Sequence, residues 1–308
     1  WYEGDGEFVP DTTLSSSWTD EDFANDPNSL NGNAAKLDIF GSSKQEWIVS
    51  PPFEASDSTY LTYDIAITES SGTDSATLGS DDLVQVLVST DCGGSYQPLL
   101  TYDASTPVSN TGESVAIDLS GFAGQKISVA FFGSEGDVND PESVDVFLDN
   151  IFLGTPDTAD IAAVSIIAPE DQACGDSMAM GAVALRNLGI FDADTVPVAI
   201  TVVGPTGTTT FADTVFGPLS FGETDSLMFG PINTYAGGTY TIEAIAGLGG
   251  DQNLANDTAE TTVFIRSTAP VAVIAPDSIC PGEQATLVVD DTLYANSEFV
   301  WFEAGTQV

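Results

Sequence analysis

The stretch LTYDIAIT, residues 61–68, places an apolar residue at every second position and a polar or small one between. Side chains of a β-strand point to opposite faces in turn, so this period predicts a strand with one face on a hydrophobic core. The segments 84–88, 115–119, 127–131 and 144–148 repeat the pattern, and Gly, Asn, Asp and Ser clusters lie between them. No segment carries the period of an amphipathic helix. The sequence therefore predicts an all-β protein.

Many short strands with frequent turns favour β-sandwiches, because an antiparallel sheet must cover its apolar face with another sheet. The chain has 308 residues, more than one hydrophobic core usually serves, at about 150 residues per domain. Stretches of small and polar residues at 154–160 and 266–270 are typical of linkers. We therefore expect tandem β-sandwich domains at 1–154 and 155–267. We also expect a third at 268–308, which is too short to be complete, so that the native chain continues.

The charge of the chain excludes several classes of function. Lys and Arg number 5 against 47 Asp and Glu, which gives a formal net charge of −42, and there is no His. Such a chain repels phosphate backbones and anionic lipids, so we expect no nucleic-acid partner. Without His, neither a Ser-His-Asp triad nor a His-ligated zinc can form. No apolar run is long enough to cross a membrane, so we expect no membrane insertion.

The same charge indicates a saline, extracellular environment. Hydrophobic residues make up 42% of the chain, which is enough for packed cores, so the anions must crowd the surface. Salt relieves their repulsion, because the screening length falls from about 8 Å at physiological salt to about 3 Å at 1 M. The first residues do not form a signal peptide, so export would need a segment outside this sequence. Cys92, Cys174 and Cys280 are too far apart for a disulfide framework, and we expect at most one internal bridge.

The first domain resembles the MAM-like jelly-roll modules, also called choice-of-anchor domains, of secreted bacterial proteins. The resemblance rests on the motifs WIVSPPF (47–53), LTYD (61–64), DLVQVLVSTDCGG (82–94), DLSGFAGQKI (118–127) and FLDNI (147–151). It implies a jelly-roll sandwich over most of residues 1–154. An acidic insertion at 69–82 and a missing start before Trp1 depart from the family pattern.

The second domain is similar to CARDB-type, immunoglobulin-like modules, which are named for cell adhesion. The similarity rests on DIAAV (160–164), RNLG (186–189), GGTYTI (237–242), NDT (256–258) and TVFI (262–265). The third segment, with ICPGEQATL at 279–287, is similar to the opening of another immunoglobulin- or PKD-like module. Such strings of modules occur in secreted and cell-surface proteins of Bacteroidetes-type bacteria, many of them exported by the type IX system. The resemblance thus implies a cell-surface location and a role in adhesion.

Calcium is the cofactor that the sequence favours, because it takes six to eight oxygen ligands and this chain is rich in carboxylates. The candidate ligands are Asp137, Asn139, Asp140, Asp145 and Asp149. The stretch lacks the ligand spacing of an EF-hand, and a solvated acidic turn is the alternative for its first three residues. For Asp149, the resemblance to jelly rolls implies a carboxylate that either binds an ion or caps a neighbouring loop.

Further acidic residues have simpler interpretations. The segment 20–22 could supply partners to a calcium site, or be an exposed acidic stretch. Asp251, Asn253, Asn256 and Asp257 are expected to form turns, since these side chains bond to their own backbone. Two carboxylates at a suitable separation can hydrolyse glycosides, but with 47 acidic residues such pairs arise by chance and no motif marks a cleft. We therefore expect no catalytic residues.

The aromatic residues fall into two groups. Trp47, Phe131, Phe132 and Phe147 lie inside strand patterns and are predicted to be buried. Four others lie at predicted edges or loops, where a ring could stack on a sugar or pack in a core or interface, namely Trp1, Tyr2, Tyr96 and Tyr102.

Together these observations predict a non-enzymatic extracellular protein, acting in adhesion or as a subunit of a cell-surface appendage or filament. Its expected partners are further copies of itself, in a homo-oligomer, and a cell-surface glycan or protein ligand. The alternative is a carbohydrate-binding accessory region of a larger secreted enzyme.

Overall fold

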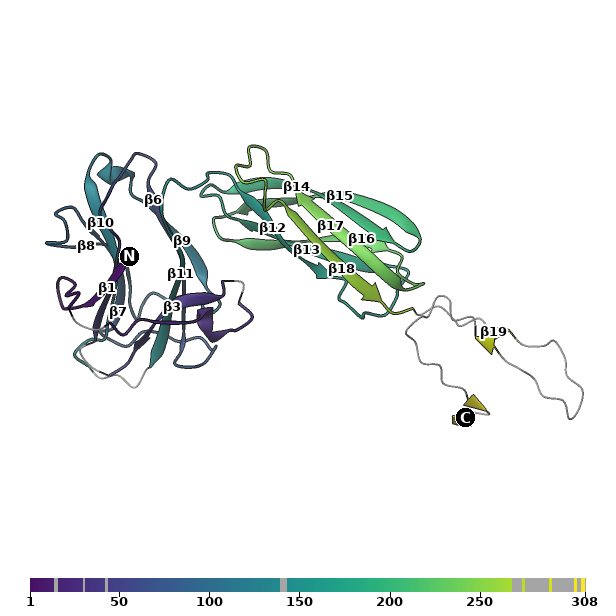
Figure 1. The fold of residues 1–308 in the computed structure, drawn as a ribbon, viewed down its shortest axis with the longest axis horizontal. Helices are drawn as coiled ribbons and strands as arrows, with labels where there is room; N and C mark the ends of the chain where they lie inside the picture. The colour runs from purple at the N-terminus through teal and green to yellow at the C-terminus, as the bar shows by residue number, and fades with distance from the viewer. Residues whose placement is uncertain are drawn as a thin grey trace, which may run out of the picture. The chain divides into compact units, whose positions relative to one another are not determined.

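The computed structural model describes residues 1–267 except 14–15, 30, 42–43 and 139–142, and beyond residue 267 only four strands of two residues each. Strands make up 55% of the chain and helix 2%, which confirms the predicted all-β, sandwich-type fold class. The chain divides into two compact units, Trp1–Thr158 and Ala159–Val308 (Figure 1). The division falls within the stretch 154–160. The domain expected at 268–308 lies outside the described residues, apart from β19 (Val273–Ile274), β20 (Val288–Val289), β21 (Phe302–Glu303) and β22 (Thr306–Gln307).

The first unit consists of two antiparallel sheets, which we call sheet A and sheet B. Sheet A has the order β1-β4-β10-β7-β8, with β5 beside β10, and sheet B has the order β2-β3-β11-β6-β9. The strands of sheet A are β1 (Tyr2–Asp5), β4 (Gln45–Val49), β5 (Phe53–Glu54), β7 (Leu83–Ser89), β8 (Gln97–Tyr102) and β10 (Lys126–Ser134). Those of sheet B are β2 (Thr19–Asp22), β3 (Asn33–Ile39), β6 (Tyr60–Glu69), β9 (Glu113–Asp118) and β11 (Val144–Gly154). Two 3-10 turns, η1 (Phe23–Asn25) and η2 (Ser120–Phe122), complete the unit.

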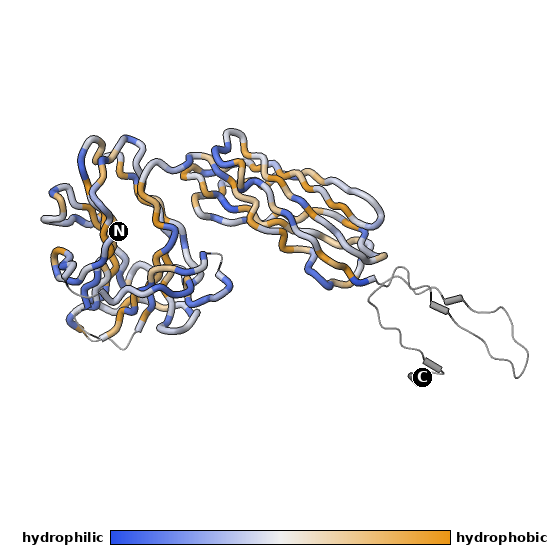
Figure 2. Tube along the Cα trace, in the orientation of Figure 1, coloured by the Kyte–Doolittle hydropathy of each residue, from blue (hydrophilic) through white to orange (hydrophobic). Residues whose placement is uncertain are grey.

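The main core of the first unit lies between its two sheets. The apolar positions of the 61–68 stretch, Leu61, Tyr63, Ile65 and Ile67, all face this core from β6. Alternate residues of β7, β10 and β11 meet them from the other strands, as the two-residue period predicts. Figure 2 shows the hydrophobic residues following the strands and the hydrophilic ones the turns.

The second unit is a sandwich of a three-stranded and a four-stranded sheet, the division found in immunoglobulin-like domains. The smaller sheet has the order β12-β13-β16 and the larger one β15-β14-β17-β18. Their bounds are β12 (Ile161–Ala168), β13 (Ala179–Asn187), β14 (Ala193–Gly204), β15 (Gly207–Leu219), β16 (Thr224–Ile232), β17 (Gly238–Ala246) and β18 (Thr258–Ile265). Val183, Leu185, Ile200 and Ile242 are among the residues buried between the sheets.

The segment after β12 runs beside the end of β18 in the same direction. The Gln172 N–H donates to the Phe264 carbonyl at 2.8 Å, and the Arg266 N–H donates to the Ala173 carbonyl at 2.8 Å. The Gly175 N–H donates to the Arg266 carbonyl at 2.7 Å, beside a parallel bridge at Cys174. The first and last parts of this unit are thus joined by backbone hydrogen bonds.

Across the part of the chain that the structure describes, no helix is long and apolar enough to span a membrane.

Candidate functional site

The outer face of sheet B is buried by the chain segment that precedes β3. Phe23 of η1 is 1% exposed and packs edge-on against Phe147 of β11, with ring centroids 6.1 Å apart. Ala24 and Ala66 complete this small second core. We call residues 23–32 the covering segment. Polar side chains hold it to the sheet on either side of Phe147.

Asp145 anchors one end of the covering segment. It is fully buried, and its Oδ2 accepts hydrogen bonds from the Asn25 side chain at 3.0 Å and from the Ser71 N–H at 2.7 Å. The Lys36 ammonium reaches the same oxygen at 2.9 Å and is itself only 16% exposed. Asn25 also donates to Thr68 Oγ1 at 3.0 Å. Asp145 is thus paired with a protein cation, and its other oxygen, Oδ1, is buried without a hydrogen-bond partner.

Asp64 and Asp149 occupy the other end, directly opposite each other on β6 and β11. Asp64 is 5% exposed and accepts hydrogen bonds from the side chains of Asn31 at 2.9 Å, Asn150 at 2.8 Å and Ser114. Asn150 has a positive φ of 49°, at a bulge that interrupts the pairing of the two strands after Asp149. The bulge turns the Asn150 amide toward Asp64, so Asp64 joins the covering segment to the sheet.

Asp149 keeps one carboxylate oxygen without a partner. Its Oδ2 is buried and accepts no hydrogen bond. Burial raises the pKa of Asp149, the neighbouring charge of Asp64 raises it further, and the Asn150 N–H opposes both. This carboxylate has the environment in which a proton or a cation would be favoured.

Three of the five predicted calcium ligands belong to the described residues, and the structure does not bring these three to one point. Asn139 and Asp140 lie outside the described residues, and Asp137 is exposed in the turn after β10. Asp145 and Asp149 are four residues apart on one strand, which separates their Cα atoms by about 13 Å. Ligand oxygens lie about 2.4 Å from a calcium ion, so these two carboxylates serve separate sites.

The remaining acidic candidate also lies apart. Residues 20–22 belong to β2, whose four side chains are all exposed. The neighbours of Asp137 contact a different acidic pair: the Val138 N–H donates to Asp81 Oδ2 at 3.0 Å and the Gly136 N–H to Asp82 Oδ1 at 3.3 Å. Among the described residues, no three His, Cys, Asp or Glu side chains form a group that could hold a metal ion.

Asp64, Asn31 and Lys36 were not identified from the sequence. Their hydrogen bonds and ion pair help to hold the outer face of sheet B and the covering segment together. Asp64 occupies one of the polar or small positions that alternate with the apolar residues of β6, so the pattern does not single it out. The only available signal was a charged residue in the middle of a strand whose other charged residue, Glu69, stands at its end.

The outer face of sheet A carries an aromatic cluster. Trp47 and Phe132 are 2% and 8% exposed, and their ring centroids are 4.5 Å apart. Tyr96 lies 5.1 Å from Trp47, and the Trp47 Nε1 donates to the Gly6 carbonyl at 2.6 Å. Burial raises the pKa of Tyr96, and so does the nearby Tyr2. Tyr2 of β1 pairs directly with Val49 of β4, which belongs to the same cluster as Trp47.

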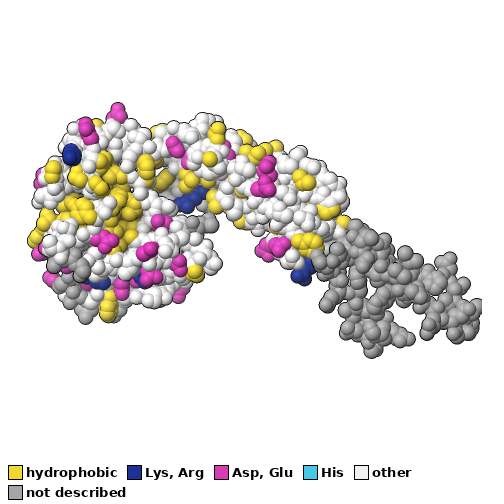
Figure 3. Space-filling view, in the orientation of Figure 1, with side chains coloured by type: hydrophobic (Ala, Val, Ile, Leu, Met, Phe, Trp, Pro, Cys, Tyr) yellow, Lys and Arg dark blue, Asp and Glu magenta, His cyan; other side chains and the backbone are white. Residues whose placement is uncertain are grey.

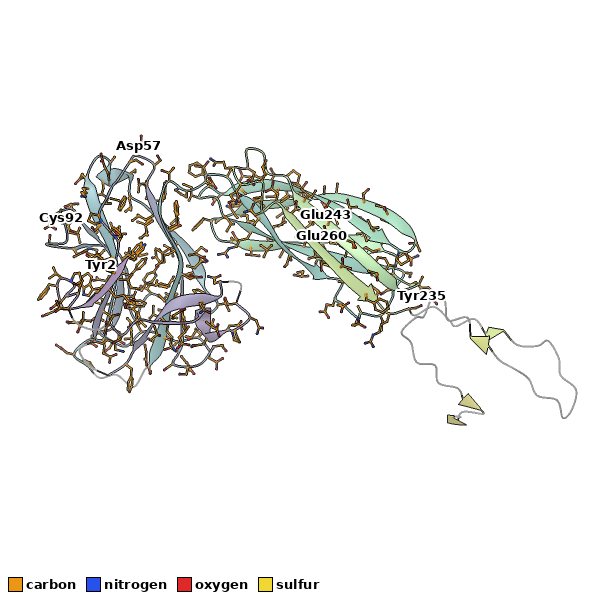
Figure 4. The ribbon with its side chains drawn as sticks, in the orientation of Figure 1. Tyr2, Asp57, Cys92, Tyr235, Glu243 and Glu260 are labelled. Carbon is orange, nitrogen blue, oxygen red and sulfur yellow. The ribbon has the colours of Figure 1, made fainter. Side chains whose placement is uncertain are left out.

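The remaining aromatic residues singled out from the sequence are partly buried and partly exposed. Trp47, Phe131, Phe132 and Phe147 are all buried, as predicted. Tyr102 is a core residue of β8, and its hydroxyl bonds to that of Tyr63 at 2.7 Å, so it offers no ring to a ligand. Trp1 and Tyr2 are 47% and 41% exposed. Figure 3 shows hydrophobic side chains exposed together on the visible side of the first unit, and Figure 4 marks the position of Tyr2, the first residue of β1.

The described residues line open pockets, among them the following two. One, of about 480 Å³, is lined by Glu69, Ser70, Ser75, Ala76, Thr77, Ser143 and Val144. The other, of about 470 Å³, lies over β14, β15 and β17 and includes Asp213. Each contains a single carboxylate. Cys92 and Cys174 are exposed free thiols, and Cys280 lies outside the described residues.

No protein-family model and no curated protein matches the chain. Matches among solved structures include the glycoside hydrolase domain of Endo-D from Streptococcus pneumoniae R6, at 16% identity and a TM-score of 0.34, covering 86% of this chain and 37% of that one. A β-glucuronidase from Parabacteroides merdae matches at 11% identity and a TM-score of 0.29, covering 86% of this chain and 30% of that one. The present chain thus spans about a third of the length of either enzyme.

A CARDB domain from Pyrococcus furiosus, solved in complex with di-metal ions, matches at 19% identity and a TM-score of 0.27. It covers 35% of this chain and 94% of its own length. The β-sandwich character of the chain rests on its own antiparallel sheets. Identities and TM-scores of this size assign the chain to no family.

Proposed function

We propose that this chain is a non-enzymatic, extracellular β-sandwich protein that serves in adhesion or as a subunit of a cell-surface appendage or filament. The observation that carries the proposal is how the buried carboxylates are used. Asp145 and Asp64 both bond to side chains of the covering segment, so they hold structure in place. General acid–base chemistry needs a carboxylate that reaches a substrate, and neither of these does.

The surface supports the same proposal. Each of the two pockets contains one carboxylate, whereas glycoside hydrolysis generally uses two. The net charge of −42 suits a saline exterior, where salt screens it. Secretion by a Bacteroidetes-type bacterium through the type IX system remains part of the proposal and rests on the module resemblances.

Assembly into a homo-oligomer is the second part of the proposal. β15 is a long strand at the edge of the larger sheet of the second unit, and it pairs with β14 alone. Free sheet edges can pair with another chain, and Phe216 on this strand is 75% exposed. Neighbouring copies would share the ions that screen their charge.

Three measurements test the proposal. Panels of glycan, ester and peptide substrates should show no turnover, and the native mass at high salt should exceed that of one chain. Bacterial cells lacking the protein should lose surface attachment or an appendage. Turnover that disappears on one Asp or Glu substitution would contradict the non-enzymatic role, and a monomer at every salt concentration would contradict assembly.

The aromatic cluster on sheet A favours a second candidate, a carbohydrate-binding accessory region of a larger secreted enzyme. Exposed rings supported by buried ones are a common sugar-binding surface, and Tyr2 lies beside the Trp47 and Tyr96 pair. Glycan-array binding that Tyr2→Ala removes, and that Tyr235→Ala retains, would establish this function. Tyr235 is a matched control because it is 42% exposed in the second unit.

A further inference from the structure

Acidic and amide side chains of the second unit join the start of β12 to the loop that precedes β18. Asp160 comes directly before β12 and is 5% exposed. Its Oδ1 accepts a hydrogen bond from the Asn256 side chain at 2.9 Å and its Oδ2 one from the Asn253 side chain at 3.4 Å. Asp160 thereby holds the two loop residues against the first strand.

Asp251 completes the connection from the loop side. Its Oδ2 accepts from the Ile161 N–H at 2.8 Å, and its Oδ1 accepts from the Asn253 N–H at 2.9 Å. Both oxygens of this carboxylate are therefore bonded. The turn-forming role expected for Asp251 and Asn253 agrees with these contacts, but their bonds also reach the start of β12.

Asp257 differs from the two other carboxylates. It is 8% exposed, and its Oδ1 is buried without a hydrogen-bond partner among the described residues. The side-chain oxygen of the preceding residue, Asn256, is likewise buried without a partner, because its amide nitrogen is directed to Asp160. Burial raises the pKa of Asp257, and the charges of Asp251 and Asp160 raise it further. Two acceptor oxygens therefore lie buried in a strongly negative environment with no donor to satisfy them.

An occupant of this position must be electron-poor, since every unsatisfied atom is an acceptor. A hard cation such as calcium suits it, because calcium binds carboxylates together with amide oxygens and water. The described carboxylates form no group of three that could hold a metal, so a ligand set at this position would include a neutral oxygen. The Asn256 side-chain oxygen is buried and has no hydrogen-bond partner.

We propose that the second unit binds a calcium ion through Asp257 and the Asn256 side-chain oxygen, with one carboxylate of Asp160 or Asp251 and water completing the shell. The ion joins the loop before the last strand to the residue before the first. This site is separate from the predicted ligands of the first unit and independent of the proposed adhesive function.

Calcium titration of the full chain at constant ionic strength tests the proposal. Thermal unfolding is followed by the NMR amide signals of β17 and β18. The unfolding midpoint should be several degrees higher in millimolar calcium than in chelator, because an ion that binds only the folded state stabilises that state. The NMR signals of the Asn256 side-chain amide should shift and saturate. Asp257→Asn should abolish the calcium effect and raise the midpoint in chelator, since it removes a buried charge that has no partner.

Asp213→Asn is the matched control, because it removes one exposed carboxylate from β15 of the same unit. It should keep the full calcium effect. The proposal fails if calcium and chelator give the same midpoint, or if Asp257→Asn keeps the calcium effect. It also fails if only acidification raises the midpoint, which would show that Asp257 takes a proton instead. If Asp257→Asn does not fold, the unmodified chain is titrated with calcium instead. NMR signals that shift elsewhere, but not at residues 160 and 251–257, would then overturn the proposal.

Discussion

Tyr63 and Tyr102 satisfy each other's hydroxyl groups inside the core of the first unit, 2.7 Å apart. Burial raises the pKa of Tyr102 to about 12, so its hydroxyl is protonated at neutral pH. Tyr63→Phe leaves the Tyr102 hydroxyl buried without its partner, and we expect the free energy of unfolding to fall by about 1–3 kcal/mol. Urea unfolding measures the change. The double variant Y63F/Y102F removes both hydroxyls and should recover part of the loss, whereas simple additivity of the two single losses would contradict the pairing.

Lys36 is one of only five basic residues in the chain, and it neutralises a fully buried carboxylate. Lys36→Met leaves the Asp145 charge without its counter-ion, and we expect a loss of about 3 kcal/mol in the free energy of unfolding. Lys126→Met is the control, because Lys126 is exposed in the same unit and its loss should change stability by less than about 0.5 kcal/mol. Equal effects of the two substitutions would show that Lys36 acts only through net charge.

At the residue scale, the sequence predicted burial but not the layer. Phe131 and Phe132 were both predicted to be buried, yet Phe131 faces the core between the sheets and Phe132 the outer face of sheet A. The alternation of side chains along a strand shows that adjacent residues point to opposite faces of the sheet. It does not show that other parts of the chain cover both faces. Hydrogen bonds such as Asn31 to Asp64 join residues 33 positions apart, so no local pattern announces them.

Strands β17 and β18 place two like charges directly opposite each other, at Glu243 and Glu260 (Figure 4). Like charges in this position destabilise a pair of strands, and opposite charges contribute about 0.2–1 kcal/mol. We expect Glu260→Lys to raise the unfolding midpoint at low salt. Glu260→Gln removes only the repulsion and should give a smaller gain. Both gains should shrink in molar salt, and gains that are independent of salt would exclude an electrostatic origin.

At the scale of elements, β6 shows what periodicity can and cannot predict. The strand itself and its inward residues follow from the alternation in 61–68. The alternation does not say what covers the outer face of β6, where Thr62, Asp64, Ala66 and Thr68 are all buried. The covering segment is short and irregular, so its sequence carries no period from which its position could be predicted.

The whole molecule carries its charge with few internal counter-ions, so its stability should depend strongly on salt. The net charge is −42. Acidic residues stand directly opposite each other on paired strands of sheet B, as Glu243 and Glu260 do in the second unit. These pairs are Asp38 with Asp145 and Asp64 with Asp149. We expect the unfolding midpoint to rise steadily from low salt to molar NaCl, because the screening length falls below the spacing of surface charges. Scanning calorimetry at a series of NaCl concentrations measures this, and KCl should act equally. A midpoint that is flat or falling with salt would contradict the prediction.

At this scale the fold class followed from length and turn spacing, while the site followed only in part. Asp145 and Asp149 were selected from the sequence, but they were assigned to one calcium site with the 137–140 turn. The pleat of β11 sets their separation, and Phe147 stands between them. Sequence distance was a poor guide because a strand lengthens the chain by about 3.3 Å per residue.

The parallel hydrogen bonds between the segment 172–175 and the end of β18 set how the second unit would bear a mechanical load. Tension applied at its two ends pulls these segments in opposite directions along their own axes. Three backbone bonds then share the force and have to break together, whereas a hairpin pulled from its open end separates one bond at a time. The adhesive role proposed above would use resistance of this kind, and the bonds lie beside the end of β18, where a load from the C-terminal side enters the unit.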